Sequence, residues 1–222
     1  MKILHVNFSD NRGGASISVM RLHKYLLDKG IDSNLLVSEQ NLNEKKVFSI
    51  SKTSEKLKNI IKSSISRNLK FIFKTKNKNT HSLNIFPSKL LKMINAFNAD
   101  IVNLHWIGNE TISISQISKI NSKVVWTLHD MWPFCGGEHY TEEDRFINGY
   151  KKSNRPNYET GFDLNRYIWN KKKKNFNNIK KIICASEWMY KKVKESSLFH
   201  DKDIIELPLI IDQKEWSPSK NV

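Results

Sequence analysis

Histidines end two apolar runs of the sequence, and each stands beside a polar or aromatic residue. His105 and Trp106 end one run, and His129 and Asp130 end the next. A neutral imidazole hydrogen-bonds a hydroxyl group, whereas a protonated imidazole binds a phosphate. A histidine paired only with a backbone carbonyl has a purely structural role. The residue types alone leave all three interpretations open.

A glycine pair follows the first apolar run. Gly13 and Gly14 come after the strand-like segment 2–8 and open a helical pattern. Glycine lets the backbone approach a ligand closely, and the first turn of a helix attracts anions. The pair lacks the G-x-G-x-x-G pattern of dinucleotide sites. It therefore indicates either a phosphate site or a tight turn.

The other reactive residue types give weaker signals. A polar cluster contains Glu138, His139, Glu142, Glu143 and Asp144. Its spacing matches no set of metal ligands, so we expect a solvated loop, no metal site and no cofactor. Cys135 and Cys184 form neither a disulfide framework nor a C-x-x-C pair. No Ser/His/Asp or Cys/His arrangement with an activating context stands out.

Strand and helix patterns alternate along the chain. We expect strands at 2–8, 32–38, 100–106, 123–130, 181–186 and 203–209. We expect helices at 16–29, after Pro87 with Ser88 as N-cap, near 111–120, at 162–176 and at 187–196. In the first helix, Val19, Leu22, Tyr25 and Leu26 should face inward. The strands are rich in Ile, Val and Leu without a polar face, which indicates a parallel sheet covered on both sides. The predicted fold is α/β, a doubly wound, mostly parallel, Rossmann-like single domain.

This fold places the reactive residues together. Parallel strands share one carboxyl edge, and ligands of doubly wound sheets bind beyond it. The glycine pair, His105 with Trp106, His129 with Asp130, and Ser186 with Glu187 all follow predicted strands. We therefore expect all four groups along one edge of the sheet. Pro133 should hold the loop after His129 extended, and the neighbouring Trp132 is most simply a packing residue.

The charge of the chain is strongly positive. Lys and Arg number 37 against 22 Asp and Glu, a net charge of +15. This favours a polyanionic partner, or it reflects lysines on solvated surfaces. Segment 45–80 holds eleven Lys/Arg and one Glu around an apolar stripe at helical spacing. It predicts a basic amphipathic helix, which either packs its stripe into the core or docks on an anionic membrane surface.

Several protein classes are disfavoured by the sequence. No run approaches the roughly 18 apolar residues of a membrane span. The N-terminus turns polar after eight residues, so we expect no export signal and a cytoplasmic location. The chain has no RRM, KH or helix-turn-helix signature, so we do not predict a nucleic-acid partner from charge alone.

Longer motifs resemble a known family. The chain contains "HVNFSDNRGGAS" near its start, "NLHWIG" at 103–108, "WTLHDMWPFCGG" at 126–137, "CASEWMYKKVKES" at 184–196 and "LPLIIDQKEWSP" at 207–218. Together they resemble the N-terminal domain of glycosyltransferase family 4, within the branch of colanic-acid and capsular polysaccharide transferases. The resemblance implies the first half of a GT-B fold, with a Rossmann-like domain at 1–208 and an inter-domain segment at 209–222. By this resemblance we expect the second domain of that fold to be absent from the chain.

The resemblance also implies an activity. It implies retaining transfer of a sugar from a nucleotide-sugar donor to a glycan or lipid-linked acceptor in bacterial surface polysaccharide synthesis. By resemblance His129 is the catalytic residue. The residues assigned to the donor are Gly13, Gly14, Ser186 and Glu187, and those assigned to the acceptor are His105, Trp106, Asp130 and Trp132.

The family's second domain carries most of the donor-binding groups, so its absence leaves two interpretations. The chain is either the N-terminal half of a glycosyltransferase, as a truncated product or with a partner chain that supplies the second domain, or an inactive module that binds a sugar or lipid acceptor. Hydrolysis or transfer of a nucleotide sugar by the chain alone would distinguish the two interpretations.

Overall fold

The computed structural model describes residues 1–211 except 51–60, 63, 66–67 and 69–72. Most of the basic helix predicted within 45–80 therefore lies outside the described residues. Within the described part of the chain, no helix is both long enough and apolar enough to cross a bilayer.

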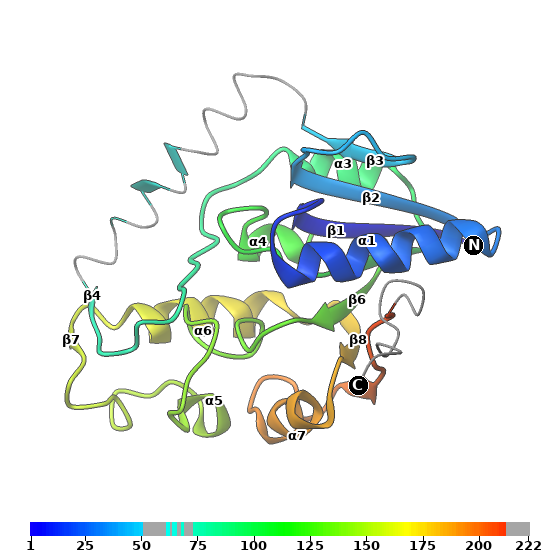
Figure 1. Cartoon of the computed structure of the whole chain (residues 1–222). Helices are drawn as coiled ribbons and strands as arrows, with labels where there is room; N and C mark the ends of the chain where they lie inside the picture. The colour runs from blue at the N-terminus through cyan, green and yellow to red at the C-terminus, as the bar shows by residue number, and fades with distance from the viewer. Residues whose placement is uncertain (51–60, 63, 66–67, 69–72, 212–222) are drawn as a thin grey trace, which may run out of the picture.

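A seven-stranded parallel sheet forms the centre of the molecule (Figure 1). Its strands, in spatial order, are β3 Val47–Ser49, β2 Asp32–Glu39, β1 Lys2–Ser9, β5 Ile101–Leu104, β6 Lys123–Leu128, β8 Ile179–Cys184 and β9 Asp203–Glu206. Every neighbouring pair is parallel. The predicted doubly wound α/β fold is thus confirmed.

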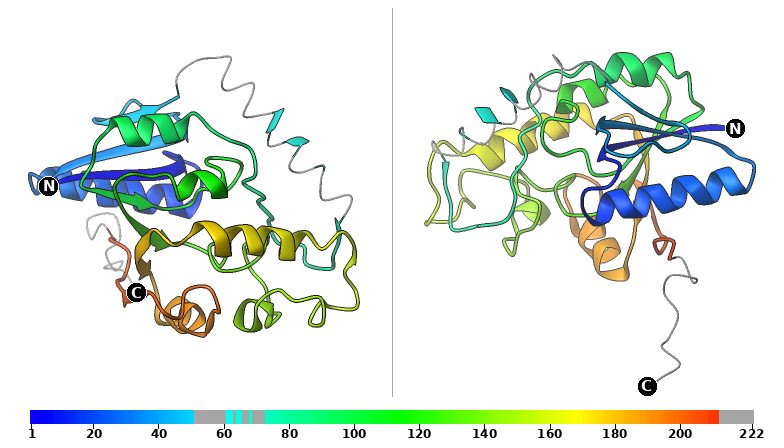
Figure 2. Two further views of the ribbon diagram at one scale, coloured as in Figure 1. Left: turned by 180° about the vertical axis from the view of Figure 1, so that it is seen from behind. Right: turned by 45° about the horizontal axis from the view of Figure 1, so that its top comes forward.

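Helices cover both faces of this sheet. They are α1 Gly13–Asp28, α3 Leu90–Ala96, α4 Ile114–Ile117, α5 Arg145–Asn148, α6 Leu164–Asn175 and α7 Glu187–Glu195. Figures 1 and 2 show α1 against one face, with α3, α4 and α6 on the opposite side. Burial of both faces explains why the strands are apolar runs rather than alternating patterns.

The winding direction reverses beside the central strand β1. The chain first runs outward to β2 and β3, and then returns to β5 on the other side of β1. Val6 of β1 pairs with Leu36 of β2 and with Leu104 of β5. Such a reversal leaves a crevice at the carboxyl ends of the two strands, which is where open α/β sheets bind ligands.

The strands carry buried polar side chains that we did not expect. His5, Asn7 and Asn103 are almost fully buried. Each finds a polar partner: Asn7 Nδ2 donates to the Ser9 carbonyl at 2.6 Å, and Thr127 Oγ1 donates to Asn103 Oδ1 at 3.1 Å. The prediction of strands without a polar face is therefore wrong at these positions, because hydrogen bonds compensate their burial.

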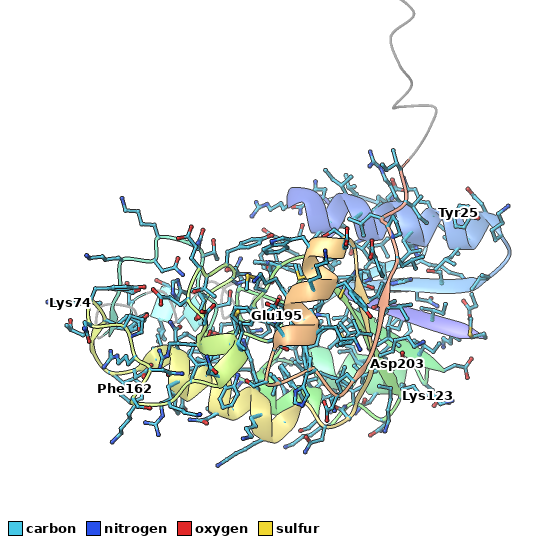
Figure 3. All side chains as sticks on the ribbon, turned by 90° about the horizontal axis from the view of Figure 1, so that it is seen from below. Tyr25, Lys74, Lys123, Phe162, Glu195 and Asp203 are labelled. Atoms are coloured by element: carbon cyan, nitrogen blue, oxygen red, sulfur yellow. The ribbon has the colours of Figure 1, made fainter. Side chains whose placement is uncertain are left out.

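Some predicted boundaries are also wrong. Helix α1 begins at Gly13 rather than at residue 16, and Tyr25 points outward (Figure 3) with its ring beside Lys29. Helix α3 begins at Leu90, one residue later than a cap at Ser88 predicts, although Ser88 Oγ accepts the Leu90 N–H at 3.2 Å as the predicted cap would. The three-residue strand β3 escaped prediction because it is too short for a periodic signal.

The segment after β6 forms an irregular lobe beyond the carboxyl edge. There β4, Phe73–Lys74, pairs antiparallel with β7, Thr160–Gly161. Figure 3 shows Lys74 and Phe162 together at this end, opposite Lys123 and Asp203, which begin β6 and β9. The buried Arg145 guanidinium holds the lobe together through Glu159 at 3.3 Å and Asp163 at 2.7 Å.

Candidate functional site

A pocket of about 610 Å³ opens at the carboxyl edge, where the winding reverses. Residues that follow three adjacent strands line it. They include Phe8 and the glycine pair from β1 and the start of α1, Trp106 after β5, and His129, Asp130 and Tyr140 after β6. Segments separated by more than a hundred residues thus meet at one cavity, as the predicted edge requires.

The glycines form one wall of this pocket. Gly13 has a φ of +81°, and no side chain caps the N-terminus of α1. A Cβ added at Gly13 or at Gly14 would meet no heavy atom within 4 Å. The space in front of the first turn is therefore open, and its N–H groups face a concavity where an anion is favourable.

His129 forms a second wall. Its Nε2 atom lies 3.1 Å from His105 Nδ1. Burial lowers the pKa of His129 to about 4, although the nearby Asp130 carboxylate acts in the opposite direction. The imidazole is therefore neutral at pH 7 and suits a hydroxyl group rather than the charge of a phosphate. Tyr140 closes over it and donates its hydroxyl to the His129 carbonyl at 3.2 Å.

The Asp130 carboxylate organises the wall next to His129. Its Oδ2 atom accepts from Trp106 Nε1 at 2.7 Å and from His139 Nδ1 at 2.5 Å, and its Oδ1 atom accepts from the Trp132 N–H at 3.0 Å. The indole of Trp106 is thereby fixed at the pocket surface, with Phe8 packed edge-on against it. Charge-assisted hydrogen bonds of this kind hold geometry more firmly than neutral ones.

His139 connects Asp130 to a serine. Its Nε2 atom lies 2.8 Å from Ser82 Oγ, which completes a Ser82–His139–Asp130 chain. This arrangement could not be predicted from the sequence, because 57 residues separate Ser82 from His139. All three side chains are buried, and the Trp132 indole donates to the Ser82 carbonyl. A substrate has no route to the Ser82 hydroxyl. The hydrogen-bonded series Ser82–His139–Asp130 therefore fixes the loop, and Ser82 does not act as a nucleophile.

The prediction of a solvated loop is accordingly wrong for Glu138 and His139, which are almost fully buried. Glu138 accepts the Tyr150 hydroxyl through Oε1. Glu142 and Asp144 are exposed, as predicted. The part of the chain that the structure describes holds no group of three or more His, Cys, Asp or Glu that could bind a metal.

Sequence reasoning missed Lys172, which is fully buried beneath the same loop. Its ammonium group donates to the Gly136 carbonyl at 2.5 Å and to the carbonyls of Trp132 and Cys135. Burial lowers its pKa to about 7. The available signal was its spacing, because Lys172 lies four residues after Ile168 on the inward face of α6.

The remaining predicted site residues lie outside the pocket lining. His105 and Trp132 are buried behind it, at 3% and 2% exposure. Ser186 caps α7 by accepting the Met189 N–H, and Glu187 is exposed and paired with Lys191. Both lie at the carboxyl end of β8, on the predicted edge but beside the pocket rather than in its wall.

Comparison with known proteins gives one finding. A family model described as Glycosyltransferase Family 4 matches residues 12–214. The match spans α1 through β9 and includes every residue that lines the pocket except Phe8. No curated protein matches the chain.

Replacing Asp130 with Asn should destabilise the protein. The amide has one accepting oxygen, whereas the carboxylate serves donors on both oxygens, so one buried N–H loses its partner. We expect the free energy of unfolding to fall by about 1–3 kcal/mol, measured by urea denaturation. Asp144→Asn, at an exposed position, is the matched control and should be neutral. Equal stability of the two variants would contradict the proposed role of Asp130.

Acid should destabilise the fold through the buried histidines. Burial lowers the pKa of His5 to about 3 and that of His129 to about 4, so the unfolded chain binds more protons below pH 6.5. Stability is therefore present above pH 6.5 and is lost as the pH falls toward 4, by about 1.4 kcal/mol per pH unit for each such histidine.

Urea denaturation at pH 7, 6 and 5 measures this loss. Burial raises the pKa of Glu159 to about 7, which acts in the opposite direction but offsets only one histidine. The variant His5→Leu should lose stability less steeply with acid than the native chain. The difference in bound protons between its unfolded and folded states is smaller by one. A native chain equally stable at pH 7 and pH 5 would show that the histidines are protonated without cost.

Proposed function

The chain belongs to glycosyltransferase family 4, and from this we propose that its pocket binds a nucleotide-sugar donor for transfer to a glycan or lipid-linked acceptor. Family membership supports glycosyltransferase activity in general. The finer proposal is a retaining enzyme of bacterial surface polysaccharide synthesis, in the colanic-acid and capsular branch. Its support is the motif resemblance together with the geometry of the pocket.

The observation that carries the proposal is the pairing of two unlike walls in one cavity. The uncapped first turn of α1 suits the charge of a diphosphate, and the neutral imidazole of His129 suits a sugar hydroxyl. A nucleotide sugar has both groups, joined through the bond that breaks in transfer. We propose that Gly13 and Gly14 contact the diphosphate and that His129, the catalytic residue, contacts the sugar near the reacting carbon.

The indole of Trp106 and the carboxylate of Asp130 supply the remaining surface that we propose for sugars. Aromatic faces pack against the apolar faces of sugar rings, and Asp130 holds the indole in place. We propose that the buried His105 and Trp132 act on the acceptor only through these neighbours. Ser186 and Glu187 are proposed to contact the donor from beside the pocket.

A second domain or partner chain is proposed to cover the pocket. Exposed apolar side chains lie along the carboxyl edge and after β9. They are Ile17, Tyr140, Trp188, Leu207, Leu209 and Ile211. The rings of Tyr140 and Trp188 adjoin, with centroids 6.5 Å apart, and exposed apolar surface marks a contact site where it is contiguous. We propose that 1–208 is the acceptor-side domain and that the covering partner supplies further groups for the nucleotide.

Donor binding tests this proposal by calorimetric titration with UDP, GDP and their sugars. Gly14 has no positive φ and an open Cβ position, so Gly14→Ala should fold as the native chain does. The added methyl group would lie where the diphosphate approaches. We expect the dissociation constant to rise at least tenfold, or about 1.4 kcal/mol. His129→Ala should weaken binding of the sugar nucleotide but not that of the free diphosphate.

The outcomes separate the alternatives. Saturable binding weakened by both substitutions supports a donor site on this chain. Binding of an acceptor glycan without any nucleotide would favour the inactive acceptor-binding module. Binding that Gly14→Ala leaves unchanged would rule out the proposed diphosphate position.

We propose further that the chain attaches peripherally to the cytoplasmic face of a membrane through 45–80, where a lipid-linked acceptor would lie. Changing Lys58, Lys62, Lys70 and Lys74 together to Gln should abolish sedimentation with anionic vesicles, because each lysine near the surface contributes about 1 kcal/mol. Neutral vesicles are the control. Binding that persists in the variant, or equally on neutral vesicles, would contradict this attachment.

A further inference from the structure

Three histidines form a continuous line from the pocket into the core. His129 Nε2 lies 3.1 Å from His105 Nδ1, and His105 Nε2 lies 3.0 Å from His5 Nδ1. The rings belong to three adjacent strands or strand ends, those of β6, β5 and β1. His5 is 1% exposed, and its Nε2 atom has no hydrogen-bond partner among the described residues. The line therefore ends at an unpaired nitrogen in the core.

Neutral imidazoles in such a line constrain one another. Each ring carries one hydrogen, on either Nδ1 or Nε2, and each nitrogen–nitrogen contact must contain one hydrogen. Burial keeps all three rings neutral, since it lowers the pKa of His5 to about 3, that of His129 to about 4 and that of His105 well below its usual value. Only two arrangements satisfy both contacts: all three rings carry Nδ1–H, or all three carry Nε2–H.

The Nε2 atom of His5, at the inner end of the line, decides between the two arrangements. With Nε2–H throughout, His5 would bury an N–H without an acceptor. With Nδ1–H throughout, His5 leaves a bare nitrogen instead. Buried donors without partners are rarer in proteins than buried acceptors without partners, which favours Nδ1–H on all three rings. Proton transfer along the line does not exchange the two, because no described group can deliver a hydrogen to His5 Nε2.

We propose that His5 and His105 are positioning residues that lock His129 as the Nδ1–H tautomer, so that it meets the ligand as a hydrogen-bond donor. His129 lines the pocket, and its Nδ1 atom makes no hydrogen bond to the described residues and is not sealed from solvent. The inference rests on the proposed function for the identity of the ligand. As a donor, His129 binds a hydroxyl oxygen of the sugar and does not accept a proton from an acceptor hydroxyl.

Nitrogen NMR of the whole chain, labelled with ¹⁵N-histidine, tests this without any ligand. Nitrogens with and without a hydrogen resonate at widely separated frequencies. We expect Nδ1–H on all three rings, and scalar coupling across both nitrogen–nitrogen contacts. Histidine free in water favours Nε2–H, so the expected result is not the default. Nε2–H at His129, or the averaged frequencies of two exchanging tautomers, would overturn the proposal.

Two variants test whether the line sets the tautomer. His105→Ala should admit water between the outer rings and release His129 to the ordinary mixture, in which Nε2–H predominates. His23→Gln is the control, because His23 bonds Ser33 Oγ and the Lys45 carbonyl rather than the line. His129 should keep Nδ1–H in it.

An unchanged His129 in folded His105→Ala would overturn the proposal. If that variant does not fold, the couplings in the native chain decide the question. Because the readout needs no nucleotide, a chain that fails to bind donors would refute the proposed function and leave this inference intact.

Discussion

The carboxylate of Asp130 is the interaction on which the carboxyl edge of the sheet depends. It accepts hydrogen bonds from the indole of Trp106, the imidazole of His139 and the backbone of Trp132. These donors come from the end of β5 and from the irregular lobe, which have no ladder bonds to each other. The Asp130 carboxylate thus joins two segments that backbone hydrogen bonds do not join, and it does so at the wall of the pocket.

Buried polar groups behind this edge follow the same physical rule. A polar atom inside a dry sheet needs a partner, and each partner needs one in turn. Asp130 leads to His139 and Ser82, while His129 leads to His105 and His5. Of these two series of hydrogen-bonded side chains, only the outer members, Asp130 and His129, therefore line the pocket. We therefore expect substitutions deep in the sheet to act on the pocket through these hydrogen bonds.

The positive charge of the chain has little to do with this pocket. Among its lining residues only Arg12 is a Lys or Arg, and that side chain pairs with Glu39 at the surface. We propose that backbone N–H groups, whose position the fold fixes, attract the anion in this pocket, rather than mobile side chains. Nearly all of the Lys and Arg side chains lie outside the pocket lining, so the proposed donor and a polyanionic partner would bind at different surfaces.

The alternation of strands and helices, the parallel sheet and the common edge of Gly13, Trp106, His129 and Asp130 could all be predicted from the amino-acid sequence. These follow from local periodicity, because apolar strand runs require covered faces. The packing of the fold was needed to show that these residues line the pocket, whereas His105 and Trp132 lie buried behind it. Ser82, His5 and Lys172 joined the site through contacts with residues at least 36 positions away in the chain. No local pattern records such contacts, since they form only when the packed sheet brings its strand ends together.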